Sequence, residues 1–335
     1  MRFYLPLFLV LISLLVGCSP APKHEISFYY WKQDFNLNQA QKAILEFNQV
    51  KKLYVKFFDV TWDSRENKAK PISKIDFKMH AGKFNIIPCI FIENQVFKQK
   101  NSPEFASKVY ELIRKIAQTN NCSIQEIQID CDWTDATRKA YFSFLSKLTA
   151  LAKNKQLITT TLRLHQFKYP KKTGVPPVKK AVLMCYNMGK IDNQKTDNSI
   201  ISEVELKKYI LESDPYPLPL DLALPSYHWG LIYRLGKLTL IVNDIDRNQL
   251  KSFAFSKIGD NNYRADSNFY YDNTYFCKND ILRIEESTPT TLLKCAEILG
   301  KSNHHFNDII FYHISSNSIS NYEKDFFSTL TSRIN

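Results

Sequence analysis

The sequence predicts one α/β domain, a (β/α)8 barrel of the TIM type with an insertion after its seventh strand. Three observations lead to this prediction. Apolar runs of strand length alternate with segments of helical periodicity from residue 26 to residue 331. Eight such runs occur, which is the number of strands in this kind of barrel. The third run is almost wholly apolar, as expected for a parallel strand that is buried on both faces.

The individual elements follow from these patterns. Strands are expected at residues 26–31, 53–62, 85–92, 124–132, 156–164, 181–188, 218–227 and 308–314. Helices are expected at residues 38–48, 103–118, 136–153, 202–212, 288–299 and 322–331. Pro103 lies in the first turn of one helix, and Ser202 forms a capping box with Glu205 at the start of another. The helices after the second and fifth strands are weakly marked.

The stretch 231–286 is polar, aromatic and less regular than the rest of the chain. We expect one added strand there, Leu238–Val242, and loops elsewhere. The alternative fold is an open, doubly wound sheet. No GxGxxG motif follows the first strand, and the chain has only 8 glycines, which disfavours a dinucleotide-binding version of that sheet and any nucleotide cofactor.

The first 18 residues have the pattern of an export signal. Arg2 precedes a short apolar core, and the segment ends Leu15-Val16-Gly17-Cys18. This ending resembles a bacterial lipobox, in which the cysteine is lipidated. The resemblance implies that Cys18 anchors the protein to a membrane and that residues 19–25 are a tether before the barrel of residues 26–335. Ser19 follows the cysteine, and by resemblance to lipoproteins with that pattern we expect the outer membrane. An ordinary signal peptide is the alternative.

Composition excludes several classes of protein. The formal charge of +12 comes from scattered lysines without a block of five basic residues, so we expect a solvated basic surface and no nucleic-acid partner. Affinity for anionic lipid or acidic glycans stays open. None of the 7 cysteines forms a CxxC motif, and His304, His305 and His313 are too loosely placed for metal ligands, so no metal is expected. Pairing of Cys277 with Cys295 cannot be decided from sequence. A monomer is expected.

The centre of the predicted site is Asp130 and Asp132 at the end of the fourth strand. Residues i and i+2 of a strand share a face, so the two carboxylates point the same way and Ile129, Cys131 and Trp133 lie on the other side. Chemistry in such barrels lies at the carboxyl ends of the strands. The alternative is that Asp130 or Asp132 caps the following helix, although Thr134 or Asp135 is better placed to do so.

The stretch 127–134 resembles the fourth-strand signature of the chitinase-like glycosidases, glycoside hydrolase family 18, which reads Asp-Gly-x-Asp-x-Asp-x-Glu. Its second and third aspartates fall on Asp130 and Asp132, and its general acid falls on Thr134. On the sixth strand, the stretch Met184–Asn187 resembles the Met-x-Tyr-Asp motif of that family, with asparagine in place of aspartate. The resemblance implies catalytic roles for Asp130, Asp132 and Tyr186, with Asn187 binding substrate.

The threonine removes the usual proton donor of the family. Three interpretations stay open. The barrel binds a glycan without cutting it, or it is an enzyme with Asp132 as acid and another carboxylate such as Asp59 as partner, or the likeness concerns the barrel only. The chain also resembles bacterial barrel lipoproteins that share a first strand ending in aromatic-Trp and a fourth strand of the type Ile-x-Asp-x-Asp, a resemblance that implies no particular reaction.

Aromatic residues complete the predicted saccharide cleft. Trp31, Trp62, Trp133 and Trp229 all fall at or just after strand ends, where their rings could stack on sugars or pack in the rim. Tyr186 and Tyr227 could donate hydrogen bonds, and His228 could contact a ligand or be structural. In the second strand, parity places Lys56 and Asp59 on opposite faces unless a bulge intervenes. The expected substrate-binding set is Trp31, Asp59, Trp133, Asn187, Tyr227, His228 and Trp229.

The sequence thus predicts a lipid-anchored envelope protein whose glycosidase-like barrel binds or hydrolyses a saccharide. The alternative is a non-catalytic glycan-binding or scaffold lipoprotein, which Thr134 favours.

Overall fold

The computed structural model describes residues 24–153, 155–245, 247–315 and 319–334. Eight parallel strands close into a barrel in the order β1, β3, β6, β7, β8, β9, β10, β18, and β1 pairs with both β3 and β18. The prediction of a (β/α)8 barrel is confirmed, and the open doubly wound sheet is wrong. Residues 1–23, with Cys18 and most of the predicted tether, lie outside the described part of the chain.

The barrel strands lie close to their predicted positions. Their bounds are β1 (Ile26–Tyr30), β3 (Lys52–Asp63), β6 (Asn85–Ile92), β7 (Glu126–Asp130), β8 (Leu157–Arg163), β9 (Lys180–Met184), β10 (Leu220–Pro225) and β18 (Phe306–Tyr312). The helices are α1 (Gln39–Phe47), α2 (Phe105–Thr119), α3 (Arg138–Ala152), α4 (Leu164–Lys168), α5 (Pro170–Thr173), α6 (Glu203–Ile210), α7 (Pro289–Gly300) and α9 (Phe326–Thr331), with short 3-10 turns at Asn94–Lys98 and Gln249–Ser252. None of the described helices is both long and apolar enough to cross a bilayer.

Two connections depart from the regular alternation, both where the helical pattern was weak. After β3 the chain forms no described helix but the strands β4 (Lys68–Ile72) and β5 (Asp76–Phe77). The first of these pairs antiparallel with β3, and the second pairs with β2 (Asp34–Phe35). After β8 the connection holds only the two short helices α4 and α5. The helix caps follow local chemistry, since Asn38 and Ser202 each accept a hydrogen bond from a backbone N–H of the first turn.

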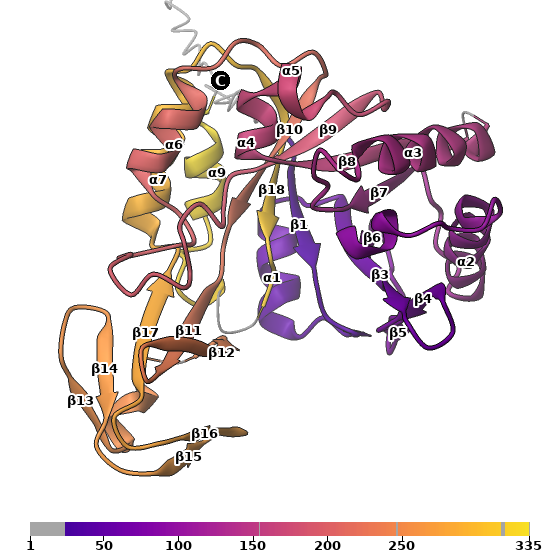
Figure 1. Cartoon of the computed structure of the whole chain (residues 1–335). Coiled ribbons are helices and arrows are strands. Elements are labelled where there is room, and N and C mark those ends of the chain that lie inside the picture. Colours follow the sequence, from indigo (N-terminus) through magenta and orange to yellow (C-terminus); the bar gives the residue numbers. More distant parts are fainter. Residues whose placement is uncertain (1–23, 154, 246, 316–318, 335) are drawn as a thin grey trace, which may run out of the picture.

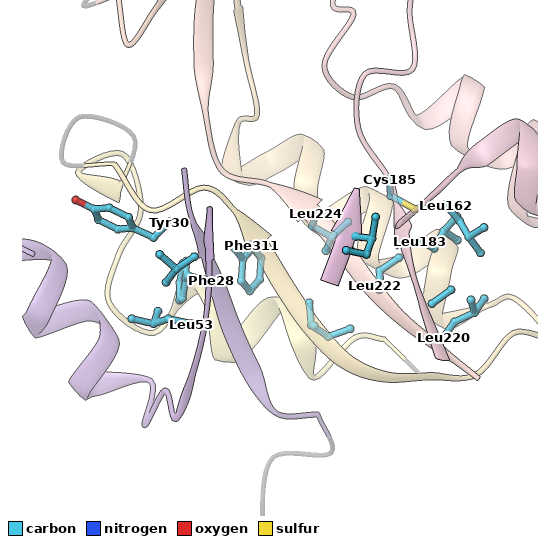
Figure 2. Close-up of a cluster of buried hydrophobic side chains, with 14 of the residues drawn as sticks. Phe28, Tyr30, Leu53, Leu162, Leu183, Cys185, Leu220, Leu222, Leu224 and Phe311 are labelled. Carbon is cyan, nitrogen blue, oxygen red and sulfur yellow. The ribbon is translucent and has the colours of Figure 1, made fainter. Parts of the chain in front are cut away.

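Alternation along the strands divides the core into two layers. Side chains on the outer face of the barrel pack against the helices, as Phe28 and Phe311 do against Phe327 of α9. Figure 2 shows this apolar layer, in which β1, β10 and β18 contribute Phe28, Leu222 and Phe311. The inner layer is smaller and more polar. It holds Tyr29 and Tyr54, and the Tyr29 hydroxyl donates to Oε1 of Gln128 at 2.8 Å.

The insertion is not a set of loops, contrary to the sequence-based expectation. Residues 228–286 form a five-stranded antiparallel sheet in the order β12, β11, β17, β14, β13, with bounds β11 (His228–Arg234), β12 (Lys237–Asn243), β13 (Phe255–Lys257), β14 (Asn262–Ala265) and β17 (Ile281–Glu286). A hairpin of β15 (Phe269–Tyr271) and β16 (Thr274–Phe276) adds to it. The sheet has its own apolar core, which includes Leu282 and Ile284. The predicted strand 238–242 is β12. Figure 1 shows the sheet at the end of the barrel opposite the C-terminus.

Candidate functional site

A cavity of about 670 Å³ opens at the carboxyl ends of the barrel strands. Its walls come from the ends of β1, β6, β7, β8, β9 and β18, from the loops that follow them and from the insertion sheet. The volume lies within the range of small-ligand sites. The lining residues are Trp31, Lys32, Phe91, Asp130, Asp132, Arg163, Leu164, His165, Met184, Tyr186, Asn187, Met188, Tyr209, Tyr227, Trp229, Asn243, Asp244, Tyr312 and His313.

Asp130 is the last residue of β7, and its carboxyl group lies in the wall of the cavity. Thr161 of β8 donates a hydrogen bond from Oγ1 to Oδ1 of Asp130 at 2.6 Å. Burial raises the pKa of Asp130 to about 7, and the negative charges of Asp132 and Asp59 add to this rise, while Thr161 and Arg163 oppose it. Near neutral pH the carboxyl group is therefore partly protonated and can donate a hydrogen bond or a proton.

Asp132 faces the same cavity, as strand alternation predicts. Its Oδ1 lies 3.3 Å from Nε of Arg163, and the side chains of both residues are 45% exposed. An ion pair this accessible adds little to stability, because water screens it. The two groups are available to a ligand, with an acceptor and a donor side by side at the mouth of the cavity.

Aromatic rings form one wall of the cavity. Tyr186 and Tyr312 stack with ring centroids 5.1 Å apart, and Trp31 meets Tyr312 edge to face at 5.6 Å. Tyr227 contacts both Tyr312 and Trp229 in the same edge-to-face manner. Burial raises the pKa of Tyr186 well above its usual value, so its phenol stays protonated. Among the described residues no partner accepts a hydrogen bond from this hydroxyl, so the proton is free for a ligand.

Tyr227 uses its hydroxyl within the protein. It donates to Oδ1 of Asn187 at 2.6 Å, so its predicted role as a hydrogen-bond donor to sugar is taken by an internal partner. Asn187 has a φ of 54°, a left-handed conformation that asparagine adopts more readily than most residues. The bond fixes the turn after β9 and holds both side chains at the cavity wall.

The insertion supplies a second wall through Trp229. The indole nitrogen of Trp229 donates to Oε2 of Glu285 at 2.8 Å, and Ser199 donates to the same oxygen. The other oxygen of Glu285 lies 2.8 Å from Nε of Arg283, and these two side chains are 0% and 1% exposed. Arg283 also donates to the backbone oxygen of Asn193 at 2.7 Å. A buried ion pair thus joins the insertion sheet, the loop after β9 and the cavity wall.

Three residues predicted to bind substrate lie outside the cavity. Trp133 is 2% exposed and stacks on Tyr141 of α3 at 5.3 Å, so its ring belongs to the core. His228 is buried at the start of β11. Asp59 is absent from the lining and pairs with Lys56 at 3.0 Å.

A bulge explains the pairing of Lys56 with Asp59. The register of β3 against β6 shifts between Lys56 and Phe58, so the two side chains meet, contrary to simple parity. The amine of Lys56 also lies 5.8 Å from the ring centroid of Trp31. Asp59 therefore does not line the cavity, but its negative charge contributes to the raised pKa of Asp130.

Thr134, at the position of the family's acid, does not line the cavity either. It is exposed, and its Oγ1 lies 3.3 Å from Oγ1 of Thr137, the N-cap of α3. Trp62 is likewise elsewhere, beside a shallow depression on β3 and β4. The fourth strand thus delivers Asp130 and Asp132 to the cavity and no third carboxyl group.

Several lining residues escaped sequence reasoning, among them Lys32, Arg163, His165, Asp244, Tyr312 and His313. Arg163 and Tyr312 end β8 and β18, so the rule that singled out Asp130 could have found them. Asp244 directly follows the insertion strand β12, and no local sequence pattern predicts that this strand lies beside the cavity. Burial lowers the pKa of His313 to about 4, so at neutral pH this cavity residue is uncharged.

Cys277 and Cys295 are both free thiols. Within the described part of the chain, no three histidine, cysteine or acidic side chains are grouped so as to hold a metal ion.

The molecule is a (β/α)8 barrel whose fold is similar to that of glycoside hydrolase family 18 enzymes of known structure. No protein-family model and no curated protein matches the sequence. Among solved structures, the spore cortex-lytic enzyme SleL of Bacillus cereus is similar, with a TM-score of 0.54 and 13% identity over 93% of this chain and 74% of that one.

Two further enzymes, one of them of glycoside hydrolase family 18, are similar along nearly their whole length. An N-acetylglucosaminidase from Paenibacillus barengoltzii has a TM-score of 0.55 and 7% identity, with 93% of this chain and 100% of that chain covered. A chitinase from Chromobacterium violaceum has a TM-score of 0.52 and 11% identity, with 92% and 98% covered. At these identities the likeness concerns the fold.

Proposed function

We propose that this chain is a lipid-anchored protein of the bacterial envelope whose barrel binds a saccharide in the cavity at the carboxyl ends of its strands. One observation carries the proposal: the aromatic rings of Trp31, Tyr186 and Tyr312 and the carboxyl groups of Asp130 and Asp132 line one cavity of about 670 Å³. Sugar rings have apolar C–H faces and polar edges. Such a ligand matches a cavity that offers both aromatic rings and hydrogen-bonding groups.

The similar solved structures support this proposal, because they include chitinases and an N-acetylglucosaminidase. One is a family 18 chitinase crystallised with a tetramer of N-acetylglucosamine. An oligosaccharide of N-acetylated amino sugars is therefore the ligand we would test first.

Hydrolysis is a second candidate function, and the raised pKa of Asp130 favours it. In this version Asp130 gives its proton to the glycosidic oxygen as the bond between that oxygen and the anomeric carbon breaks. Water takes the place of the leaving group. Asp130 fits the acid better than Asp132, which is paired with Arg163. We favour binding without turnover, because residue 134, at the position of the family's general acid, is a threonine and has no carboxyl group.

Binding and hydrolysis are tested together. Residues 19–335 contain every described contact, and this chain is titrated with chito-oligosaccharides while tryptophan fluorescence is followed, then incubated with aryl glycosides and polysaccharides. We expect saturable binding that Trp31→Ala and Asp132→Asn each weaken about tenfold, which corresponds to about 1.4 kcal/mol of binding free energy. Turnover that Asp130→Asn abolishes would establish the enzyme. Neither binding nor turnover with any saccharide would contradict both candidates.

The anchor is tested separately. Cells that produce the full chain are labelled with radioactive palmitate and fractionated. We expect label in the protein and the protein in the outer membrane, and we expect Cys18→Ala to lose both. Unlabelled wild-type protein released in soluble form would contradict the anchor without touching saccharide binding.

A further inference from the structure

The loops that lead from a helix into the next strand meet at the amino end of the barrel, opposite the cavity. Five of their lysines are exposed, and none makes an ion pair with a described residue. Two of these lysines follow directly on the last turns of α3 and α7, where the helix dipole favours a cation. The five are Lys51, Lys153, Lys155, Lys179 and Lys301, and we call this set the amino-end lysines.

Most acidic groups at this end already have partners within the protein. At the starts of the barrel strands, Lys52 and Lys180 form ion pairs with Glu25, Glu126, Asp221 and Asp308. On the loops at this end, Glu212 pairs with Lys168 at 3.0 Å, and Asp214 alone is exposed without an ion pair among the described residues. The cavity end is mixed in sign, with pairs such as Asp132 with Arg163. On the exposed surface of the amino end the lysines therefore outnumber the acidic groups, and this surface carries a positive field.

The chain enters the described fold at this same end. His24 is 2% exposed, and its two ring nitrogens lie 2.9 Å and 3.0 Å from the backbone oxygens of Asn307 and Ile334. Cys18 precedes His24 by six residues, which span at most about 20 Å when fully extended. An anchor at Cys18 therefore holds the amino-end lysines within a short distance of the bilayer.

We propose that the amino end of the barrel lies against an anionic phospholipid surface, with the amino-end lysines on the headgroups and the cavity facing away from the membrane. This inference rests on the proposed lipid anchor. A lysine-rich face that opposes an anionic leaflet gains electrostatic attraction that salt weakens.

The test measures cosedimentation of residues 19–335, without lipid, with vesicles of phosphatidylcholine and with vesicles that also contain phosphatidylglycerol. We expect binding to the anionic vesicles only, and loss of it at high salt. Replacement of the amino-end lysines by glutamine should weaken binding at least about tenfold. The matched control replaces five exposed lysines at or near the cavity end and on the insertion, Lys98, Lys100, Lys190, Lys237 and Lys257, and should bind like the wild type.

Three outcomes would overturn the proposal. They are equal loss in the two variants, equal binding to both kinds of vesicle, and no binding to either. Binding to dextran sulfate without binding to anionic vesicles would assign the face to a polyanionic glycan instead. Because the tested chain lacks the lipid and the cavity is untouched, failure here is distinct from failure of the anchor or of saccharide binding, which palmitate labelling and fluorescence titration report.

Discussion

The indole nitrogen of Trp229 donates a hydrogen bond to the carboxylate of Glu285 at 2.8 Å, and through this bond the insertion sheet holds one wall of the cavity in place. Glu285 also neutralises Arg283, which has almost no exposed surface. A ring that must stack on a ligand binds better when its orientation is fixed beforehand, because less conformational entropy is lost. The insertion therefore contributes to the site by positioning as well as by enclosing it.

Removal of Glu285 should be costly, because it leaves the charge of Arg283 buried without a partner. We expect Glu285→Leu to lower the free energy of unfolding by about 3–5 kcal/mol in urea denaturation. The control is Glu286→Gln, since Glu286 pairs with Arg247 at a more accessible place and should cost less than about 1 kcal/mol. The double variant Arg283→Met with Glu285→Leu should recover most of the loss. Equal effects of Glu285→Leu and Glu286→Gln would contradict this account.

The two tryptophans near the mouth of the barrel should behave in opposite ways. Trp133 is buried against Tyr141, so Trp133→Ala should lower the free energy of unfolding by about 3–5 kcal/mol. Trp229 is partly exposed at the cavity, so Trp229→Ala should cost less than half as much and should weaken saccharide binding. Urea denaturation and fluorescence titration measure the two effects. If Trp133→Ala unfolds no more easily than Trp229→Ala, the assignment of Trp133 to the core is wrong.

Asp130 should make the stability of the protein depend on pH. Its pKa rises on folding from an ordinary value of 3.8 to about 7, so the folded state binds the proton more tightly. Its contribution to stability is complete below pH 4 and is lost as pH rises through 7. Asp130→Asn removes this titration. As pH rises between those limits, the free energy of unfolding of the variant should therefore increase relative to that of the wild type by up to about 1.4 kcal/mol per pH unit. Parallel curves of unfolding free energy against pH would refute the raised pKa.

The neighbours of Asp130 should move its pKa in opposite directions. Arg163→Gln removes a positive charge and should raise the pKa, while Asp132→Asn removes a negative charge and should lower it. Titration of carboxyl carbons by NMR measures both shifts. The control is Asp135→Asn, an exposed position outside the cavity lining, which should leave the titration of Asp130 unchanged. A shift of the same sign in both variants would mean that structural change and not charge controls this group.

Much of the barrel could be predicted because each of its strands carries its own signal. A buried parallel strand is recognised as a short apolar run. In β7 this run is followed directly by Asp130 and Asp132, which mark the end of the strand. For Trp133, two sequence rules disagreed: strand alternation and position at a strand end. Alternation from Ile129 to Trp133 places its ring on the face away from Asp130, as the structure has it, whereas its position at a strand end suggested the cavity.

The insertion and part of the site could not be predicted for a different reason. Strands of three or four residues such as β13 and β14 are too short for alternation to show, and their pairing joins residues far apart in sequence. The bulge near Phe57 has no mark in the sequence, yet it decides that Lys56 meets Asp59. Trp229 reaches Glu285 across the sheet, a contact that depends on the register of β11 against β17.

The position of β1 between β3 and β18 also has a mechanical consequence. A pull on residue 24 along the strand loads both neighbouring ladders in shear, so their hydrogen bonds must rupture together instead of one after another. The buried His24 ring, whose nitrogens lie 2.9 Å and 3.0 Å from the backbone oxygens of Asn307 and Ile334, adds a contact at the point where the force is applied. A protein tethered by its first residues would thus bear tension on two ladders of backbone hydrogen bonds at once.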